Sequence, residues 1–172
     1  MASTVDQRTT YGCSAAVLHA TLTDAEYWQD RMAEIGNGSA VVDHVVDDGR
    51  VTSVVDQALE ADRLPKALQR FAGSSMSARC TESWDTARDD GSATGTYTLR
   101  VTKMPVVIDG ELELIPVGPQ ECVLRFVGTV VASVPIMGPV VEKVMVGEMD
   151  KSFEAEREFT TAWLASDRAD RS

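Results

Sequence analysis

Residues 139–163 read PVVEKVMVGEMDKSFEAEREFTTAW and predict one long helix, because Pro139 suits the first turn of a helix and no later proline interrupts the segment. At 1.5 Å per residue the helix would span about 37 Å, which is enough to cross a small sheet. Turning each residue by about 100° places apolar side chains on one stripe, which we expect to face the core. This stripe consists of Val141, Val144, Met145, Ala155, Phe159, Ala162 and Trp163.

The segments before this helix alternate between apolar and polar residues, which predicts strands. Residues 76–85 show the pattern most clearly, and residues 97–101, 111–114 and 121–134 repeat it. Two β-branched segments, 39–46 and 50–60, are joined by Asp47-Asp48-Gly49, whose Asp-Gly step suits a tight hairpin. We therefore predict a sheet of antiparallel strands that follow one another along the chain.

Two short helices are predicted among the strands. Residues 8–22 would form a first strand leading into a helix, because Thr23 and Glu26 have the spacing of a capping box. A second helix would begin at Asp62 and end at Gly73. Its apolar face would carry Leu64, Leu68 and Phe71, and its other face Arg63, Lys66 and Arg70. The basic face would either be solvated or allow transient contact with an anionic membrane surface.

A strand, a short helix, a run of antiparallel strands and a long final helix form an α+β order, in which the sheet curls around the last helix. Short motifs accompany it: Leu22-Thr23-Asp24, Tyr27-Trp28, Ala61-Asp62-Arg63-Leu64-Pro65, Glu82-Ser83-Trp84, Gly95-Thr96-Tyr97, Val134-Pro135-Ile136-Met137-Gly138, Glu142-Lys143, Glu154-Ala155-Glu156-Arg157-Glu158-Phe159 and Trp163-Leu164.

This helix-grip order and these motifs resemble the START-like (SRPBCC) superfamily, and within it an uncharacterised actinobacterial family of small stand-alone proteins. The resemblance covers nearly the whole chain. It implies a single START-like domain over residues 1–172, with its core at about 8–165. It also implies a cavity between the sheet and the last helix, which the superfamily uses for lipids, polyketides and other apolar ligands.

Composition limits the classes of function. The 172 residues include 16 Lys and Arg against 27 Asp and Glu, and the formal net charge of −11 disfavours binding to nucleic acid. Cys13, Cys80 and Cys122 are far apart in the sequence, so we expect no disulfide framework and a cytoplasmic location. We expect no signal peptide, and no segment is long and apolar enough to span a bilayer.

Strand parity and the helix stripe together predict the wall of the cavity. The wall would be mostly apolar with few polar groups, and the second short helix and residues 134–138 would be its gates. The expected lining is Trp84, Tyr97, Leu99, Leu112, Leu114, Phe126 and Val130 from the strands, with Met145, Glu148, Met149 and Ser152 from the helix.

Glu148 is the most unusual residue of this wall, because it lies at the centre of the apolar stripe with Ser152 one turn further along. A carboxylate there is costly unless it is paired, hydrated or protonated. The functional hypothesis is that Glu148 faces the cavity and either orients a ligand or acts as an acid or base. The structural alternative is that Glu148 lies at a wet rim or pairs with an arginine.

Glu82 and His44 are further candidates, because each is in phase with apolar neighbours on its strand. A strand bulge would turn Glu82 outward, and a lone inward histidine is more often a core residue than a catalyst. We expect the chain to bind a hydrophobic or amphipathic small molecule, as a carrier or sensor, without cofactor or metal. The rival hypotheses are a cyclase- or hydratase-type enzyme using Glu148 with Glu82 or His44 as acid and base, and an interaction protein with a solid core.

Overall fold

The computed structural model describes residues 2–59, 62, 66–70 and 76–166. Within these residues, seven strands form one antiparallel sheet in the order β1-β7-β6-β5-β4-β3-β2. Neighbours in the sheet are consecutive along the chain except for β1 and β7, whose register places Tyr11 opposite Cys122. The strands are β1 (Ala2–Tyr11), β2 (Ser39–Asp47), β3 (Arg50–Leu59), β4 (Met76–Trp84), β5 (Ala93–Val101), β6 (Val106–Gly118) and β7 (Glu121–Ala132).

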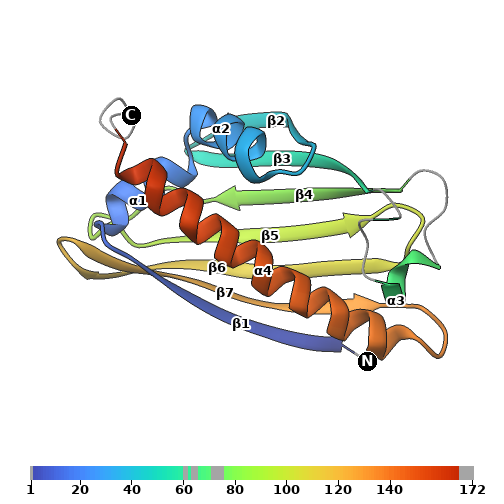
Figure 1. Ribbon diagram of the computed structural model, residues 1–172. Coiled ribbons are helices and arrows are strands. Elements are labelled where there is room, and N and C mark those ends of the chain that lie inside the picture. The colour runs from blue at the N-terminus through green and yellow to red at the C-terminus, as the bar shows by residue number, and fades with distance from the viewer. Residues whose placement is uncertain (1, 60–61, 63–65, 71–75, 167–172) are drawn as a thin grey trace.

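The long helix α4 (Gly138–Leu164) crosses one face of the sheet and contacts β1 and β7 (Figure 1). Helices α1 (Ala15–Leu22) and α2 (Ala25–Ile35) lie near the end of α4, and α3 (Lys66–Gln69) lies near its beginning. The main core lies between α4 and the sheet face that it covers, which we call the inner face. The predicted α+β helix-grip fold is confirmed.

The predicted alternation of the strands is also confirmed. In β4, Met76, Ala78, Glu82 and Trp84 are buried on the inner face, whereas Arg79 is exposed on the outer face. The predicted hairpin of β2 and β3 is present, and Asp48 and Gly49 both have positive φ angles, of 48° and 80°. Positive φ at both central residues is the requirement of a type I′ turn, which explains the Asp-Gly step.

The prediction for residues 8–22 was wrong in part. Strand β1 begins at Ala2 and ends at Tyr11, and the rest of the segment forms α1, whose N-cap Ser14 accepts a hydrogen bond from the Val17 amide. The cap of α2 is Asp24, which accepts a 2.8 Å hydrogen bond from the amide of Tyr27. Thr23, the predicted cap, instead donates its hydroxyl to the carbonyl oxygen of His19 at the end of α1.

Helix α4 has nearly the predicted length, and Val141, Phe159 and Trp163 of the predicted stripe are buried, but the buried face is rotated relative to that stripe. Ala162 is exposed, and Val144 and Ala155 are only half-buried. The buried side chains are Val141, Glu142, Met149, Glu156, Phe159, Thr160 and Trp163. Because two glutamates and a threonine lie on the buried face, a stripe drawn through apolar residues alone is rotated away from it. Buried polar side chains are tolerated where they have partners, and partners cannot be read from helical spacing.

Most of the second predicted short helix falls outside the described residues. The structure shows one turn of it, α3, with Lys66 and Arg70 exposed, while Leu64 and Phe71 of its predicted apolar face, together with Arg63 and Gly73, lie outside the described residues. Its predicted role as a gate therefore stays a prediction. Among the described residues, no helix combines the length and the apolar character needed to cross a membrane.

Candidate functional site

A small cavity lies between the inner face of the sheet and α4. Its volume of about 20 Å³ is room for about one water molecule. The wall combines apolar side chains with two carboxyl groups. The lining residues are Gln7, Thr9, Glu82, Tyr97, Leu112, Leu124, Phe126, Phe153 and Glu156.

Phe126 occupies the centre of the apolar wall. Beneath its ring lie Gly110 and Gly128, which are directly opposite each other in β6 and β7. A Cβ atom at either glycine would clash with the Phe126 ring, so the ring occupies space that only glycine leaves open. Tyr97 and Phe153 pack against this ring, with centroid separations of 5.5 Å and 5.3 Å. These tilted and edge-on contacts make a close-packed aromatic wall.

Glu82 contributes a carboxyl group to the cavity wall from the inner face of β4. The group is buried and accepts a 2.7 Å hydrogen bond from the indole Nε1 of Trp84. Burial, followed by the negative charge of Glu156, raises the pKa of Glu82 to about 7, although Arg31 and the Trp84 hydrogen bond oppose the shift. The carboxyl group therefore changes between its neutral and charged forms near neutral pH.

Glu156 reaches the cavity from the buried face of α4 and pairs with Arg31 of α2. The distance from Arg31 Nη2 to Glu156 Oε2 is 2.8 Å, and the two side chains are only 11% and 9% exposed. The Arg31 guanidinium also lies over the Trp28 ring, 4.7 Å from its centroid. Its Nε and Nη1 atoms are buried without a hydrogen-bond partner. Such unpaired donors are uncommon in protein interiors, and they leave Arg31 able to bind a further acceptor.

The other polar groups near the cavity are held neutral by burial. Tyr27 shares a 2.8 Å hydrogen bond with Thr160, and burial raises the pKa of both Tyr27 and Tyr97 well above the usual range. Burial also raises the pKa of Cys80 to about 12. Glu82 is thus the group of this cluster that changes its charge near neutral pH.

The structure places Glu148 and Ser152 away from the cavity, contrary to the prediction. Glu148 Oε1 lies 2.8 Å from Lys151 Nζ, its side chain is 43% exposed, and Ser152 is exposed as well. Glu148 is therefore exposed to water and paired, as the structural alternative stated, but its partner is a lysine and not an arginine. Glu156, about two turns further along α4, has the position that Glu148 was predicted to have.

His44 is half-buried and lies opposite the buried Ser53, but a bulge between Val41 and Asp43 breaks the strand phase from which its direction was predicted. It is not part of the cavity wall. Its Nδ1 atom lies 2.9 Å from the hydroxyl oxygen of Ser53 on β3. The other histidine, His19, places Nε2 2.9 Å from the carbonyl oxygen of Asp85. In the ranges that the structure describes, no three His, Cys, Asp or Glu side chains are grouped so that they could hold a metal ion.

The remaining predicted residues divide into wall and surrounding core. The predicted residues that line the cavity are Tyr97, Leu112 and Phe126. Trp84 does not line it, but donates a hydrogen bond to Glu82, which does. Those of the surrounding core are Leu114, Val130 and Met149, fully buried, and Leu99 and Met145, packed against them. The lining residues absent from the prediction are Gln7, Thr9, Leu124, Phe153 and Glu156. Leu124 shares the parity of Phe126, so this signal was present in the sequence.

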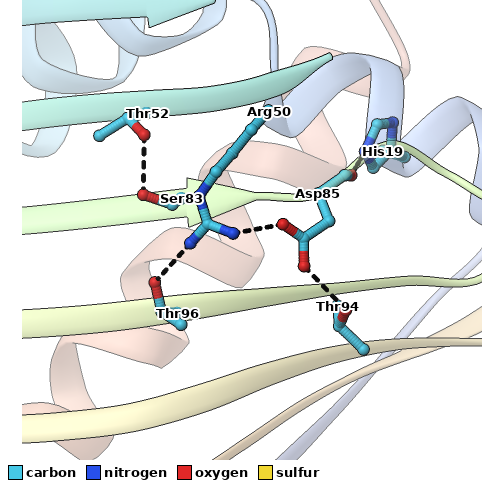
Figure 2. Close-up of polar contacts among 7 residues, drawn as sticks. All are labelled: His19, Arg50, Thr52, Ser83, Asp85, Thr94 and Thr96. Atoms are coloured by element: carbon cyan, nitrogen blue, oxygen red, sulfur yellow. Dashed lines mark hydrogen bonds and ion pairs between the residues drawn. The ribbon is translucent and has the colours of Figure 1, made fainter. Parts of the chain in front are cut away.

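A larger concavity, of about 550 Å³, lies on the outer face of the sheet. Figure 2 shows polar side chains at its margin, where Arg50 pairs with Asp85 and Thr94 donates a 3.1 Å hydrogen bond to the same carboxylate. Arg50 also donates to the hydroxyl of Thr96 at 3.2 Å. Because Arg50 and Asp85 are 42% and 47% exposed and already paired, they offer little binding energy. The inner cavity is the stronger candidate.

Several solved structures share this fold. The Zhui aromatase/cyclase of Streptomyces sp. R1128 has a TM-score of 0.61 at 12% identity and covers 97% of this chain and 98% of its own. A START superfamily protein of Mycobacterium smegmatis has a TM-score of 0.53 at 13% identity, with 92% and 94% covered. Human STARD10 has a TM-score of 0.58 at 15% identity, with 91% and 62% covered. These similarities show a START-like fold.

Sequence relatives give the family. Two proteins described as uncharacterized, one of Mycobacterium tuberculosis and one of Mycobacterium bovis, are each 24% identical to this chain over 175 residues. The alignment covers 96% of this chain and 99% of each relative. The family model described as "Protein of unknown function (DUF2505)" matches residues 6–164, which include every residue that lines the inner cavity. The chain therefore belongs to the DUF2505 family.

Proposed function

We propose that this chain binds a small amphipathic molecule between the sheet and α4, with the polar end of the ligand at Arg31 and Glu82. The observation that carries the proposal is the Glu82 carboxyl group, which titrates at the cavity wall together with a second lining carboxylate, Glu156. The Arg31 guanidinium that pairs with Glu156 has two further buried N–H groups without a partner. The aromatic wall of Tyr97, Phe126 and Phe153 would hold the apolar part of the ligand.

Stability alone gives little reason for this polar cluster. Replacing a buried ion pair by apolar residues of similar volume is often neutral or stabilising. The second buried carboxyl group, Glu82, adds a repulsive neighbour to Glu156 and so increases the cost. Groups whose protonation is perturbed by burial and by a nearby charge concentrate at functional sites. Recognition of a ligand gives the cluster a role that packing does not.

A ligand needs more room than the cavity now offers. Small-molecule sites usually enclose about 300–1,000 Å³, whereas this cavity has about 20 Å³. Phe153 and the core residues Met145 and Met149 all come from α4. Methionine side chains are unbranched and adapt to differently shaped apolar guests. Binding would therefore proceed with repacking of these α4 side chains, which would enlarge the cavity.

The chemistry of the polar end favours a ligand with a hydrogen-bond acceptor. A guanidinium donates in a planar fork that fits carboxylate or sulfonate oxygens. Glu82 can donate a proton to the same acceptor while it is neutral, and it repels an anion once it is charged. An anionic ligand should therefore bind more tightly below pH 7 than above it.

Native mass spectrometry of the freshly purified protein tests whether it carries a ligand. The mass of the native protein is compared with the mass after denaturation. A reproducible increment that is lost on denaturation would support the proposal and would start the identification of the bound molecule. A bare mass would argue against tight carriage, and binding would then be judged by the titration that follows.

The titration uses 1-anilinonaphthalene-8-sulfonate, a fluorescent probe with an apolar ring system and a permanent negative charge. We expect saturable binding at one site, with an affinity that falls between pH 6 and pH 8 in the wild-type protein. Glu82→Gln should abolish this pH dependence, whereas Glu148→Gln, the same change at an exposed position, should leave it intact. Absence of one-site binding, or an unchanged pH dependence in Glu82→Gln, would contradict the proposal.

The same site allows a second candidate function, acid–base catalysis of the cyclase or hydratase kind. Two carboxyl groups, Glu82 and Glu156, line one cavity, and the pKa of Glu82 near 7 suits a general acid or base. An enzyme and a carrier differ in the molecule they retain. If Glu82→Gln retains a molecule of a different mass from the one on the wild-type protein, catalysis is favoured; the same mass on both favours a carrier.

A further inference from the structure

Cys13 and Cys122 are far apart in the sequence but meet where β1 ends. Tyr11, the last residue of β1, lies directly opposite Cys122, and the chain bends at Gly12 and Cys13 before Ser14 caps α1. Cys13 packs against the core cluster that contains Cys122, and the two thiols are near enough to shift each other's pKa. Cys122 is fully buried, whereas Cys13 is only partly buried. The structure thus brings together two thiols of which one is accessible.

The two thiols differ in their tendency to ionise. Cys13 precedes the N-cap of α1, where the positive end of the helix dipole favours a thiolate. The interaction between the two thiols lowers the pKa of Cys13, and the same interaction, together with burial, raises the pKa of Cys122. Oxidation of a thiol follows its thiolate character and its exposure. Cys13 therefore has the properties of an attacking thiol, and Cys122 those of a resolving thiol.

We propose that Cys13 and Cys122 form a reversible redox pair, which hydrogen peroxide oxidises to a disulfide and a low-molecular-weight thiol reduces again. The Cys13 sulfur attacks one peroxide oxygen, the O–O bond breaks, and the leaving hydroxide takes up a proton to become water. The sulfur of Cys122 then attacks the Cys13 sulfenic acid and displaces its hydroxyl group as a second water. The thiols are oxidised by two electrons, which the peroxide accepts.

The disulfide would connect the end of β1 to the start of β7. Gln7 and Thr9 of β1 line the inner cavity, so the bond would fix one side of the cavity wall to the rest of the sheet. It would also close a long loop of the chain, and long closed loops favour the folded state by restricting the unfolded one. The redox pair does not depend on the proposed ligand, because it rests on the two thiols alone.

The test treats the reduced full-length protein with hydrogen peroxide and then blocks the remaining thiols with N-ethylmaleimide in denaturant. We expect a loss of about 2 Da before blocking and a linked peptide that contains Cys13 and Cys122, which dithiothreitol separates. Cys80, whose pKa is raised to about 12 by burial, should remain free and be alkylated. The oxidised protein should unfold at a higher temperature than the reduced protein.

Single variants separate the roles of the thiols, with far-UV circular dichroism as the check on folding. Cys80→Ser is the matched control and should form the disulfide as the wild-type protein does. Cys122→Ser should stop at a Cys13 sulfenic acid, which dimedone traps, and Cys13→Ser should leave Cys122 unoxidised. The proposal is overturned if Cys13 and Cys122 both stay alkylatable after peroxide, if Cys80 oxidises as fast as Cys13, or if Cys13→Ser gains the same thermal shift.

Discussion

The two halves of α4 each bury a glutamate, and the two glutamates are treated differently by their surroundings. Glu142, near the start of the helix, accepts hydrogen bonds of 3.1 Å from the Ser3 hydroxyl and from the Ala132 amide. Glu156, near the end, pairs with Arg31, whose Nε and Nη1 find no partner. The oxygens of Glu142 thus accept hydrogen bonds from two donors in the sheet. Glu156 instead pairs with a cation that has two further N–H donors without a partner.

We assign a structural role to Glu142 and the proposed ligand-binding role to the surroundings of Glu156. The two donors to Glu142 belong to β1, an edge strand, and to β7 next to it, so the carboxylate ties α4 to that end of the sheet. Around Glu156 lie a cavity and a second carboxyl group, Glu82, with a pKa near 7. The proposed site therefore rests on the two carboxyl groups at the cavity and on the unpartnered donors of Arg31, and not on the burial of a charged residue by itself.

Of the variants that test this comparison, loss of Arg31 should change the free energy of unfolding most. Arg31→Met leaves Glu156 buried without its cation, and removal of one partner from a buried pair costs about 3–5 kcal/mol of unfolding free energy. The double variant Arg31→Met with Glu156→Leu should recover most of the loss, because no uncompensated charge remains. Urea unfolding measures both. A single variant as stable as the wild-type protein would show that the pair is solvated.

The pH dependence of stability should show the next largest effect. The pKa of Glu82 is higher in the folded state than in the unfolded chain, so its contribution is full below about pH 4.5 and is lost as the pH rises through about 7. Between these limits the free energy of unfolding should fall by up to about 3 kcal/mol relative to that of Glu82→Gln. Urea unfolding of both proteins at pH 5 and pH 8 gives the difference. A wild-type curve parallel to that of the variant would contradict the raised pKa.

Glu142→Gln should have a smaller effect. The amide keeps an acceptor for the Ala132 amide and a donor that the Ser3 hydroxyl can accept, so a loss of about 1 kcal/mol is expected. Glu156→Gln, the matched change in the other half of α4, should cost more, because it leaves the Arg31 charge without an anion. Thermal unfolding of the two variants compares them. Equal losses would remove the distinction between the two halves of the helix.

Glu148→Gln should have the smallest effect, below about 0.5 kcal/mol, because the ion pair of Glu148 with Lys151 is open to water. Unfolding in low and high salt would show the same small difference from the wild-type protein. A loss comparable to that of Glu156→Gln would indicate that Glu148 faces inward in solution, as its place in the helical stripe suggested.

Strand parity was the part of the sequence that predicted structure best. The position of Glu82 on the inner face, the type I′ hairpin and the aromatic wall residues Tyr97 and Phe126 all follow from a period of two and an Asp-Gly turn. Because one face of the sheet is buried, a shift of one residue in strand register would move apolar side chains to the wrong face. A short alternating pattern therefore predicts which face each side chain of the strand occupies.

The helices were harder to predict, because their polar residues depend on partners that are distant in sequence. Glu156 lies on the buried face of α4 since Arg31 of α2 pairs with it, and no spacing within residues 139–163 encodes that contact. Helix α1 was missed because several neighbouring residues could each cap a helix. Ser14 caps α1, Thr23 lies at its end, and Asp24 caps α2. Cys13 and Cys122 were likewise judged by their separation in sequence, which the pairing of β1 with β7 removes.

The pairing of β1 with β7 also sets an order for folding during synthesis. The ribosome makes β1 before the other strands of the sheet, yet β7 is its neighbour in the described structure. At about 5–20 residues per second, roughly 6–22 s pass between the synthesis of Tyr11 and that of Cys122. During this time the backbone groups of β1 can bond only to water or to the wrong strand. The contact that closes the sheet is therefore the slowest to form and the most exposed to misfolding.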